Sequence, residues 1–144
     1  MNSRALVIPA DPAAPVKVIV WPYGLDTDAT ARRTLDILYA EIGCTCIDAT
    51  PQVRTPMGIT VCGWSDDVSL LKDQPEYNDR AIAMFRHFGY QVPALAGNIV
   101  LTGGADPVGD TLPLDENLIT WLVEVFASVA ADLAAQGVTQ DGAP

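Results

Sequence analysis

Hydrophobic side chains recur at helical spacing in three stretches of the chain, over residues 27–42, 75–88 and 115–135. In each stretch the apolar positions lie three or four residues apart, with charged side chains between them, so we expect three amphipathic helices. Pro75 fits the first turn of the second helix, because the N–H that proline lacks would have no partner there. The predicted buried stripes are Ala31, Leu35, Leu38 and Ile42 in the first helix, and Tyr77, Ala81, Met84 and Phe88 in the second.

Five short runs of β-branched and other apolar residues predict strands, over residues 4–9, 16–21, 44–49, 59–64 and 98–102. A proline-rich link joins the first two runs and a turn-rich loop joins the next two, which predicts two hairpins. The elements together predict a single α+β domain over residues 1–136. We expect a mostly antiparallel sheet of about five strands packed against three helices. Residues 137–144 have nothing to bury and are predicted to form a disordered tail.

The third helix has a wider apolar surface than one neighbouring sheet usually covers. Its predicted core stripe comprises Leu118, Ile119, Leu122, Phe126, Val129 and Leu133. Trp121 and Val125 widen this stripe on one side, so the apolar arc exceeds half of the helix circumference. We expect Trp121 and Val125 to form an exposed edge that meets a second copy or a partner protein. The alternative is a helix buried deeply within its own domain.

Charge is distributed unevenly along the 144 residues, whose formal net charge is −10, because every Lys and Arg lies at or before Arg86. Nucleic acids and anionic membranes bind basic surfaces, so direct binding to either is not expected. A charged partner should be basic, unless the acidity serves only to keep the protein in solution. No apolar run approaches the roughly 20 residues that a bilayer-spanning helix needs, and the start does not resemble a signal peptide. We therefore expect a cytoplasmic protein.

Three cysteines, Cys44, Cys46 and Cys62, are candidate nucleophiles or metal ligands. Their odd number excludes a complete set of intramolecular disulfides and suits a reducing compartment. His87 could supply a fourth ligand or a base, but the helical pattern places it with Arg80 on the solvent face. The spacing is not that of a common zinc site, and buried cysteines behave as small hydrophobes. We expect no metal, no cofactor and no thiol catalysis.

The glycine-rich segment over residues 103–110 precedes the third helix, as a phosphate-binding loop would. Asp106 and Asp110 would repel a phosphate, so the segment is interpreted as a loop that needs glycine at positive φ. These two aspartates, and separately Asp66 and Asp67, could also hold a divalent cation. Neither pair has the alternating ligand pattern of a calcium loop, and both are interpreted as solvated turns.

Five motifs occur in a recognisable order: ALVIPADPAAPVKVIV, LDILYAEIGCTCID, ITVCGWSDD, QPEYNDRA and LAGNIVLTGGADPVGD. Together they resemble a family of small domains of unknown function found in actinobacteria and their bacteriophages. The resemblance covers residues 5–110, departs from the pattern at Cys44, where a second glycine is usual, and leaves out the third helix. It implies an α+β fold and a phage or mobile-element setting, and it implies no activity.

These observations predict a non-enzymatic, phage-encoded module that binds and perturbs a host protein in the bacterial cytoplasm. The residues expected to contact the partner are apolar or acidic: Trp121, Val125, Glu124, Asp132, Asp106 and Asp110. One alternative is an acidic DNA mimic that occupies the basic groove of a host nucleic-acid-binding protein. Another is a small enzyme, or a ligand- or metal-binding protein, that uses the cysteines or the glycine-rich loop.

Overall fold

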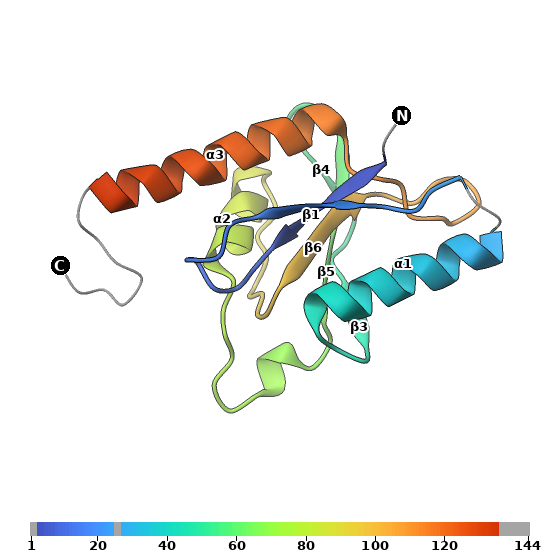
Figure 1. Ribbon diagram of the computed structural model, residues 1–144, viewed down its shortest axis with the longest axis horizontal. Coiled ribbons are helices and arrows are strands. Elements are labelled where there is room, and N and C mark those ends of the chain that lie inside the picture. The colour runs from blue at the N-terminus through green and yellow to red at the C-terminus, as the bar shows by residue number, and fades with distance from the viewer. Residues whose placement is uncertain (1–2, 25–26, 136–144) are drawn as a thin grey trace.

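The computed structural model describes residues 3–24 and 27–135, with the backbone alone for Thr27 and residues 132–135. It shows one α+β arrangement of a sheet and three helices, as predicted (Figure 1). The strands are β1 (Arg4–Ile8), β2 (Lys17–Val20), β3 (Ile47–Ala49), β4 (Val53–Arg54), β5 (Thr60–Asp66) and β6 (Ile99–Gly103). The helices are α1 (Thr27–Ile42), α2 (Asp79–His87) and α3 (Glu116–Ala135), with a single 3₁₀ turn, η1 (Ser69–Leu71).

The strands form one sheet in the order β2-β1-β6-β5-β3, with the short β4 paired to β5. Each strand pair within the described residues is antiparallel. The first predicted hairpin is confirmed, because Leu6 of β1 is paired with Val18 of β2. In the second, Asp48 of β3 is paired with Ser65 of β5 as expected, but the predicted loop between them contributes β4, which also pairs with β5. β6 lies at the centre of the sheet and is buried along its whole length.

Alternate side chains of the central strands enter two cores, one on each face of the sheet. Ala5 and Val7 of β1 pack with Trp21, Leu38 and Ile42 under α1. Leu6 and Ile8, which alternate with these two residues along β1, point to the opposite face. That larger core lies under α2 and α3 and includes Leu6, Ile8, Ala81, Met84, Phe85, Ile99, Leu101, Leu118, Ile119 and Leu122. The helices therefore cover both faces, α1 on one and α2 with α3 on the other.

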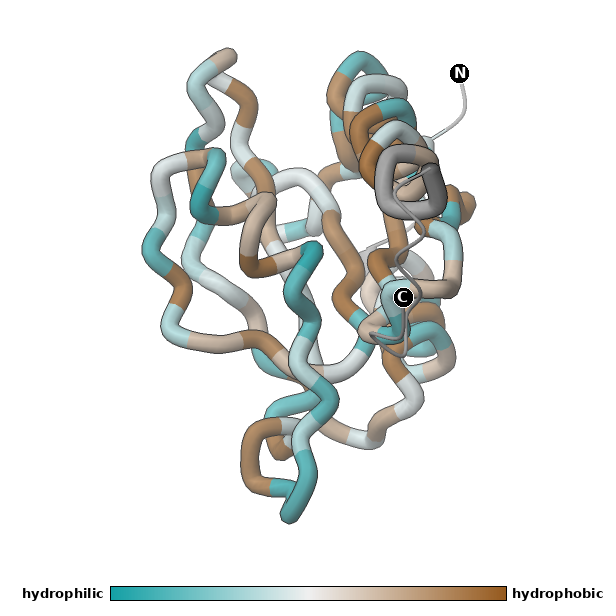
Figure 2. Tube along the Cα trace, turned by 90° about the vertical axis from the view of Figure 1, so that its left-hand side faces the viewer, coloured by the Kyte–Doolittle hydropathy of each residue, from teal (hydrophilic) through white to brown (hydrophobic). Residues whose placement is uncertain are grey.

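Figure 2 shows that hydrophobic and hydrophilic residues are interspersed along the strands and helices. The loop with η1 projects from the lower end in both views and carries exposed Val68, Leu70 and Leu71 beside hydrophilic residues. None of the helices in the described part of the chain combines the length and apolarity that crossing a membrane requires. The tail predicted for residues 137–144 lies outside the described residues.

The predicted start of α2 was wrong. The helix begins at Asp79, and the side chain of Asn78 caps it by accepting a hydrogen bond from the Ala81 N–H. Pro75 precedes the helix, and Tyr77 forms an isolated β-bridge with Ala96 that leaves its side chain 52% exposed. Capping by Asn78 satisfies a first-turn backbone donor that has no partner within a helix beginning at Asp79.

The buried side of α1 also differs from the predicted stripe. Leu38 and Ile42 are buried as expected, but Ala31 and Leu35 are exposed. Ile37 packs against the core in their place. The second half of α1 covers the sheet, whereas the first half extends towards the side of the molecule (Figure 1). The buried side of α1 runs through Thr30, Leu38 and Ile42, so Ala31 and Leu35 lie beside it rather than on it.

Candidate functional site

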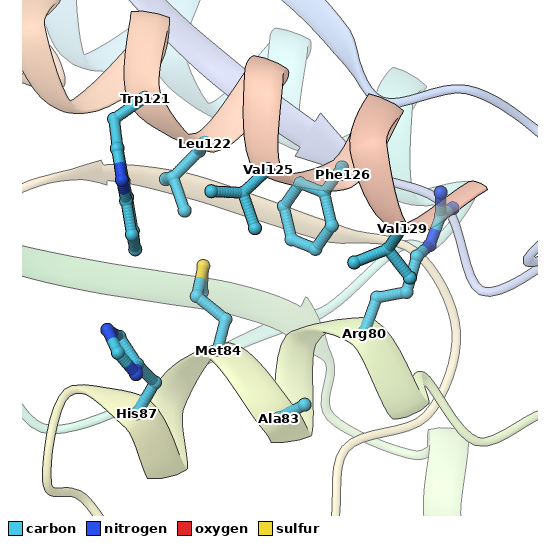
Figure 3. Close-up of a pocket in the computed structure, with 9 residues that line it drawn as sticks. All are labelled: Arg80, Ala83, Met84, His87, Trp121, Leu122, Val125, Phe126 and Val129. Carbon is cyan, nitrogen blue, oxygen red and sulfur yellow. The ribbon is translucent and has the colours of Figure 1, made fainter. Parts of the chain in front are cut away.

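An apolar groove of about 310 Å³ lies between α2 and α3. Its lining comes from one side of each helix and consists of Arg80, Ala83, Met84, His87, Trp121, Leu122, Val125, Phe126 and Val129. Figure 3 shows the α3 side chains pointing towards α2, with Met84 and His87 pointing back at them. We refer to this feature as the α2/α3 groove.

The α3 wall exposes part of its apolar surface. Leu118 and Leu122 are buried and hold the helix on the sheet. Trp121 is 37% exposed, as predicted, but Val125 is only half-buried rather than exposed. Val129, which was predicted to lie in the core stripe, is 50% exposed, because the end of the helix extends beyond the side chains that bury Leu118 and Leu122. Trp121 and Val125 are therefore not enclosed by the rest of the chain, and both line the groove. Large apolar side chains that are left partly open beside a groove are typical of a binding surface.

The α2 wall was missed by the sequence prediction, which placed Arg80 and His87 on the solvent face. Arg80 is half-buried instead, whereas His87 is exposed as predicted, and both line the groove. The His87 ring stacks on the Trp121 indole, with 5.6 Å between ring centroids and 26° between ring planes. At the other end of the groove, the Arg80 guanidinium lies 5.9 Å from the centroid of the Phe126 ring. These contacts bring the end of α2 to the start of α3 and the start of α2 to the middle of α3. The two helices therefore run antiparallel.

Arg80 is half-buried and is held by the end of β1 and the residues that follow it. Its Nη2 donates to the carbonyl oxygens of Pro9, at 2.8 Å, and Asp11, at 3.1 Å. Its Nε is buried and has no hydrogen-bond partner among the residues that the structure describes. Burial lowers the pKa of Arg80, and the nearby charge of Asp11 opposes this shift. The spacing of Arg80, Met84 and His87 is the signal in the sequence that could have placed all three on one side of α2.

The two rims of the groove differ in charge. Glu124 is exposed on α3, and the whole helix over residues 116–135 contains no Lys or Arg. On α2, Arg86 is exposed but does not line the groove, while Arg80 is engaged by the two carbonyl oxygens. The side chain of Asp132, which was predicted to join this surface, lies outside the described part of the structure. The α3 rim is therefore acidic where it can be described.

Asp106 and Asp110 are not part of the groove lining. Both lie in the loop between β6 and α3, where the Asp106 carboxylate accepts hydrogen bonds from the N–H groups of Val108 and Asp110 and from the Tyr23 hydroxyl. Desolvation raises the pKa of Asp106, but these hydrogen bonds outweigh it and lower the pKa below its ordinary value. The hydrogen bond that the Tyr23 hydroxyl donates to the Asp106 carboxylate also raises the pKa of Tyr23. Asp106 thus organises its own loop.

The cysteines are free thiols in three different environments, with Cys44 half-buried, Cys46 exposed and Cys62 buried. Burial is the main cause that raises the pKa of both Cys44 and Cys62, so these two thiols stay protonated at neutral pH. Cys62 donates to the Thr50 carbonyl oxygen at 3.5 Å. Among the described residues, no group of three or more His, Cys, Asp or Glu side chains is placed to hold a metal ion.

The glycine-rich loop borders a second cavity of about 370 Å³, whose lining includes Cys62, Gly103 and Gly104 and has no charged side chain. The prediction that this loop needs positive φ is correct at Gly109, where φ is 90°, but wrong for Gly103 and Gly104. These two glycines allow close packing instead. A Cβ at Gly103 would lie 2.5 Å from the Pro113 carbonyl oxygen, and one at Gly104 would lie 2.6 Å from Gln52 Oε1.

No family model, no curated protein and no solved structure matches this chain. The resemblance to the actinobacterial and bacteriophage family therefore stays a prediction. What the α2/α3 groove can do has to be argued from its own residues.

Proposed function

We propose that the protein is a non-enzymatic module that binds another protein through the α2/α3 groove. The observation that carries this proposal is the incomplete burial of Trp121 and Val129 along a groove with a mostly apolar lining. Covering such side chains removes apolar surface from water, and tryptophan is among the residues that contribute most to protein interfaces. We also propose, from the family resemblance, that a phage encodes the protein and that its partner is a host protein.

The chemistry of the groove favours binding over catalysis. Its lining contains no nucleophile, and its one ionisable ring, that of His87, is stacked on Trp121. A catalytic base has to lie within hydrogen-bonding distance of a nucleophile or substrate proton, and its orientation is usually fixed by a third group. His87 has instead an aromatic partner, which suits a contact surface.

The DNA-mimic alternative requires carboxylates that are free and arranged in rows. Several acidic side chains here are committed within the chain. Glu116 is paired with Arg4 at 2.6 Å, Glu41 with Lys17 at 2.9 Å and Asp66 with Lys72 at 3.8 Å. Carboxylates neutralised in this way are poor substitutes for phosphates, so we retain the groove as the binding surface.

The proposal is tested by replacing Trp121 with Ala and Val125 with Ser in the same chain. Truncation of a central interface tryptophan costs roughly 2 kcal/mol or more, so we expect capture of the partner from an actinobacterial lysate to be lost. The matched control is Val20→Ser, because Val20 is 75% exposed on the edge strand β2, outside the groove lining.

Circular dichroism of both variants establishes that the fold is retained. A partner that is captured equally by the wild type and by the Trp121→Ala/Val125→Ser protein would refute the proposal. A partner lost from the control as well would show that another surface is responsible.

A further inference from the structure

The dimensions of the α2/α3 groove indicate what kind of segment it accommodates. Trp121, Val125 and Val129 occur at every fourth position of α3 and span about 12 Å at the helical rise of 1.5 Å per residue. Apolar side chains at positions i, i+4 and i+7 of a bound helix span about 10.5 Å at the same rise, which is close to this length. Both walls are helices, whose backbone groups are already hydrogen-bonded, so the groove offers no edge to which an extended strand could pair.

The acidic rim on α3 indicates the charge of that segment. Glu124 lies about 60° around the helix from Trp121, on the side away from Leu122, at 100° per residue. This position puts it at the outer edge of the groove, where it is exposed and forms no ion pair within the described residues. A bound helix would therefore present one flank to Glu124. Lys or Arg on this flank complements the rim, whereas Asp or Glu is repelled.

The α3 helix of a second copy of the chain does not fit this charge pattern. It is the long apolar helix that could enter the groove, but residues 116–135 contain no Lys or Arg. An α3 from another copy would bring its own acidic residues to the acidic rim, and each copy carries a net charge of −10. Like charges brought together across an interface oppose association.

We infer that the α2/α3 groove binds an amphipathic helix of a partner protein, with its apolar face on Trp121, Val125 and Val129 and its basic flank along Glu124. This inference rests on the proposed function and specifies the chemistry of the partner. The bound helix packs against both α2 and α3, so that the three helices form one packed layer.

The inference is tested with two synthetic peptides of about 15 residues, a length at which isolated helices are marginally stable. Both carry leucine at the i, i+4 and i+7 positions, and they differ only in lysine or glutamate along one flank. We expect the lysine peptide to bind about two- to fivefold more tightly for each ion pair that it forms, since exposed pairs contribute weakly. Added salt should reduce this preference.

The decisive variant is Glu124→Lys, which should reverse the preference towards the glutamate peptide. Its matched control is Asp36→Lys, the same kind of charge reversal at an exposed residue of α1, which should leave the preference unchanged. Affinities are measured by calorimetry. Shifts of the Trp121 indole N–H and the His87 ring in nuclear magnetic resonance spectra locate the binding.

Each other outcome overturns a separate statement. Equal binding of both peptides, or a Glu124→Lys protein with unchanged preference, refutes the basic flank. If neither peptide binds while Trp121→Ala/Val125→Ser still abolishes partner capture, the partner is not a helix and the proposed function stands. A dimer in light scattering that dissociates on Trp121→Ala identifies a second copy as the occupant and overturns the inference.

Discussion

Asn78 shows how much of this fold depends on a single polar side chain. It is 1% exposed, and its Oδ1 accepts the Ala81 N–H that would otherwise lack a partner at the start of α2. Its Nδ2 donates to the carbonyl oxygen of Ile8, at 2.8 Å, and to that of Gly97, at 3.0 Å. The amide thus joins the start of α2 to the end of β1 and to the turn before β6, and so positions one wall of the groove.

Replacing Asn78 with Ala should lower the free energy of unfolding by about 2–4 kcal/mol. Loss of the cap contributes about 1 kcal/mol, and the two buried carbonyl oxygens lose a donor as well. Asn78→Asp keeps the cap but places a carboxylate against both carbonyl oxygens, so we expect it to be destabilising too. Urea denaturation measures both variants. A change below about 0.5 kcal/mol for Asn78→Ala, typical of an unconstrained surface site, would contradict this role.

The sequence predicted that a helix follows Pro75, but it could not locate its first residue. Proline favours an early helical position and asparagine favours the cap, and these two signals compete within three residues. The hydrogen bonds from Nδ2 decide the outcome, and they reach Ile8, which lies 70 positions away along the chain. Contacts of that kind cannot be deduced from local spacing.

Among the elements, α3 has the most uneven environment. Leu118, Ile119 and Leu122 near its start are buried, whereas Val129 further along is half exposed. The start is also fixed to β1, because Arg4 forms a hydrogen-bonded ion pair with Glu116 and its carbonyl oxygen accepts the Leu114 N–H. The helix is therefore held firmly in its first turns and more weakly beyond them.

Two alanine substitutions in α3 should differ in consequence for this reason. Leu122→Ala removes a buried side chain and should cost about 2–5 kcal/mol of unfolding free energy. Val129→Ala removes a half-exposed side chain and should stay within about 0.5 kcal/mol, while weakening partner binding at the groove. Denaturation curves of the two variants, recorded in parallel, measure both changes in unfolding free energy. Equal destabilisation by both variants would show that the second half of α3 is packed as tightly as the first.

Periodicity was sufficient to predict α3 and the excess of its apolar surface. It was not sufficient to predict the groove, because the opposite wall belongs to α2. A helical pattern shows which residues share a face but not which neighbour covers that face. Arg80 looked like a solvent-facing residue because its charge concealed the long aliphatic stem and the ring contact through which it packs on Phe126.

For the whole molecule, carboxyl groups that are hydrogen-bonded in the folded state make stability depend on pH. The hydrogen bonds from Arg4 lower the pKa of Glu116 below its ordinary value, although desolvation acts in the opposite sense. A carboxyl group whose folded pKa is lowered adds stability above its unfolded pKa, about 4.3 for glutamate, and this contribution is lost as the pH falls further. Asp106 behaves in the same direction.

Glu116→Gln should therefore reduce the fall of the melting temperature between pH 6 and pH 3, a range that brackets the ordinary glutamate pKa of about 4.3. Asp36→Asn removes one negative charge as well, but from an exposed residue of α1, and serves as the control for general repulsion. Thermal melts followed by circular dichroism give both profiles. If the two variants show the same pH dependence as each other, the pairing with Arg4 does not contribute.

Because α3 is attached mainly through its first turns, its later turns should be able to move while its start stays fixed. Backbone amides near Leu118 and Leu122 should exchange with deuterium only when the protein unfolds as a whole, whereas those near Val129 should exchange through local fraying of the free end. A ligand bound in the groove would contact the later turns of α3 and restrict their fraying. Slower exchange of the amides near Val129 would therefore indicate that the groove is occupied, even without a crystal of the complex.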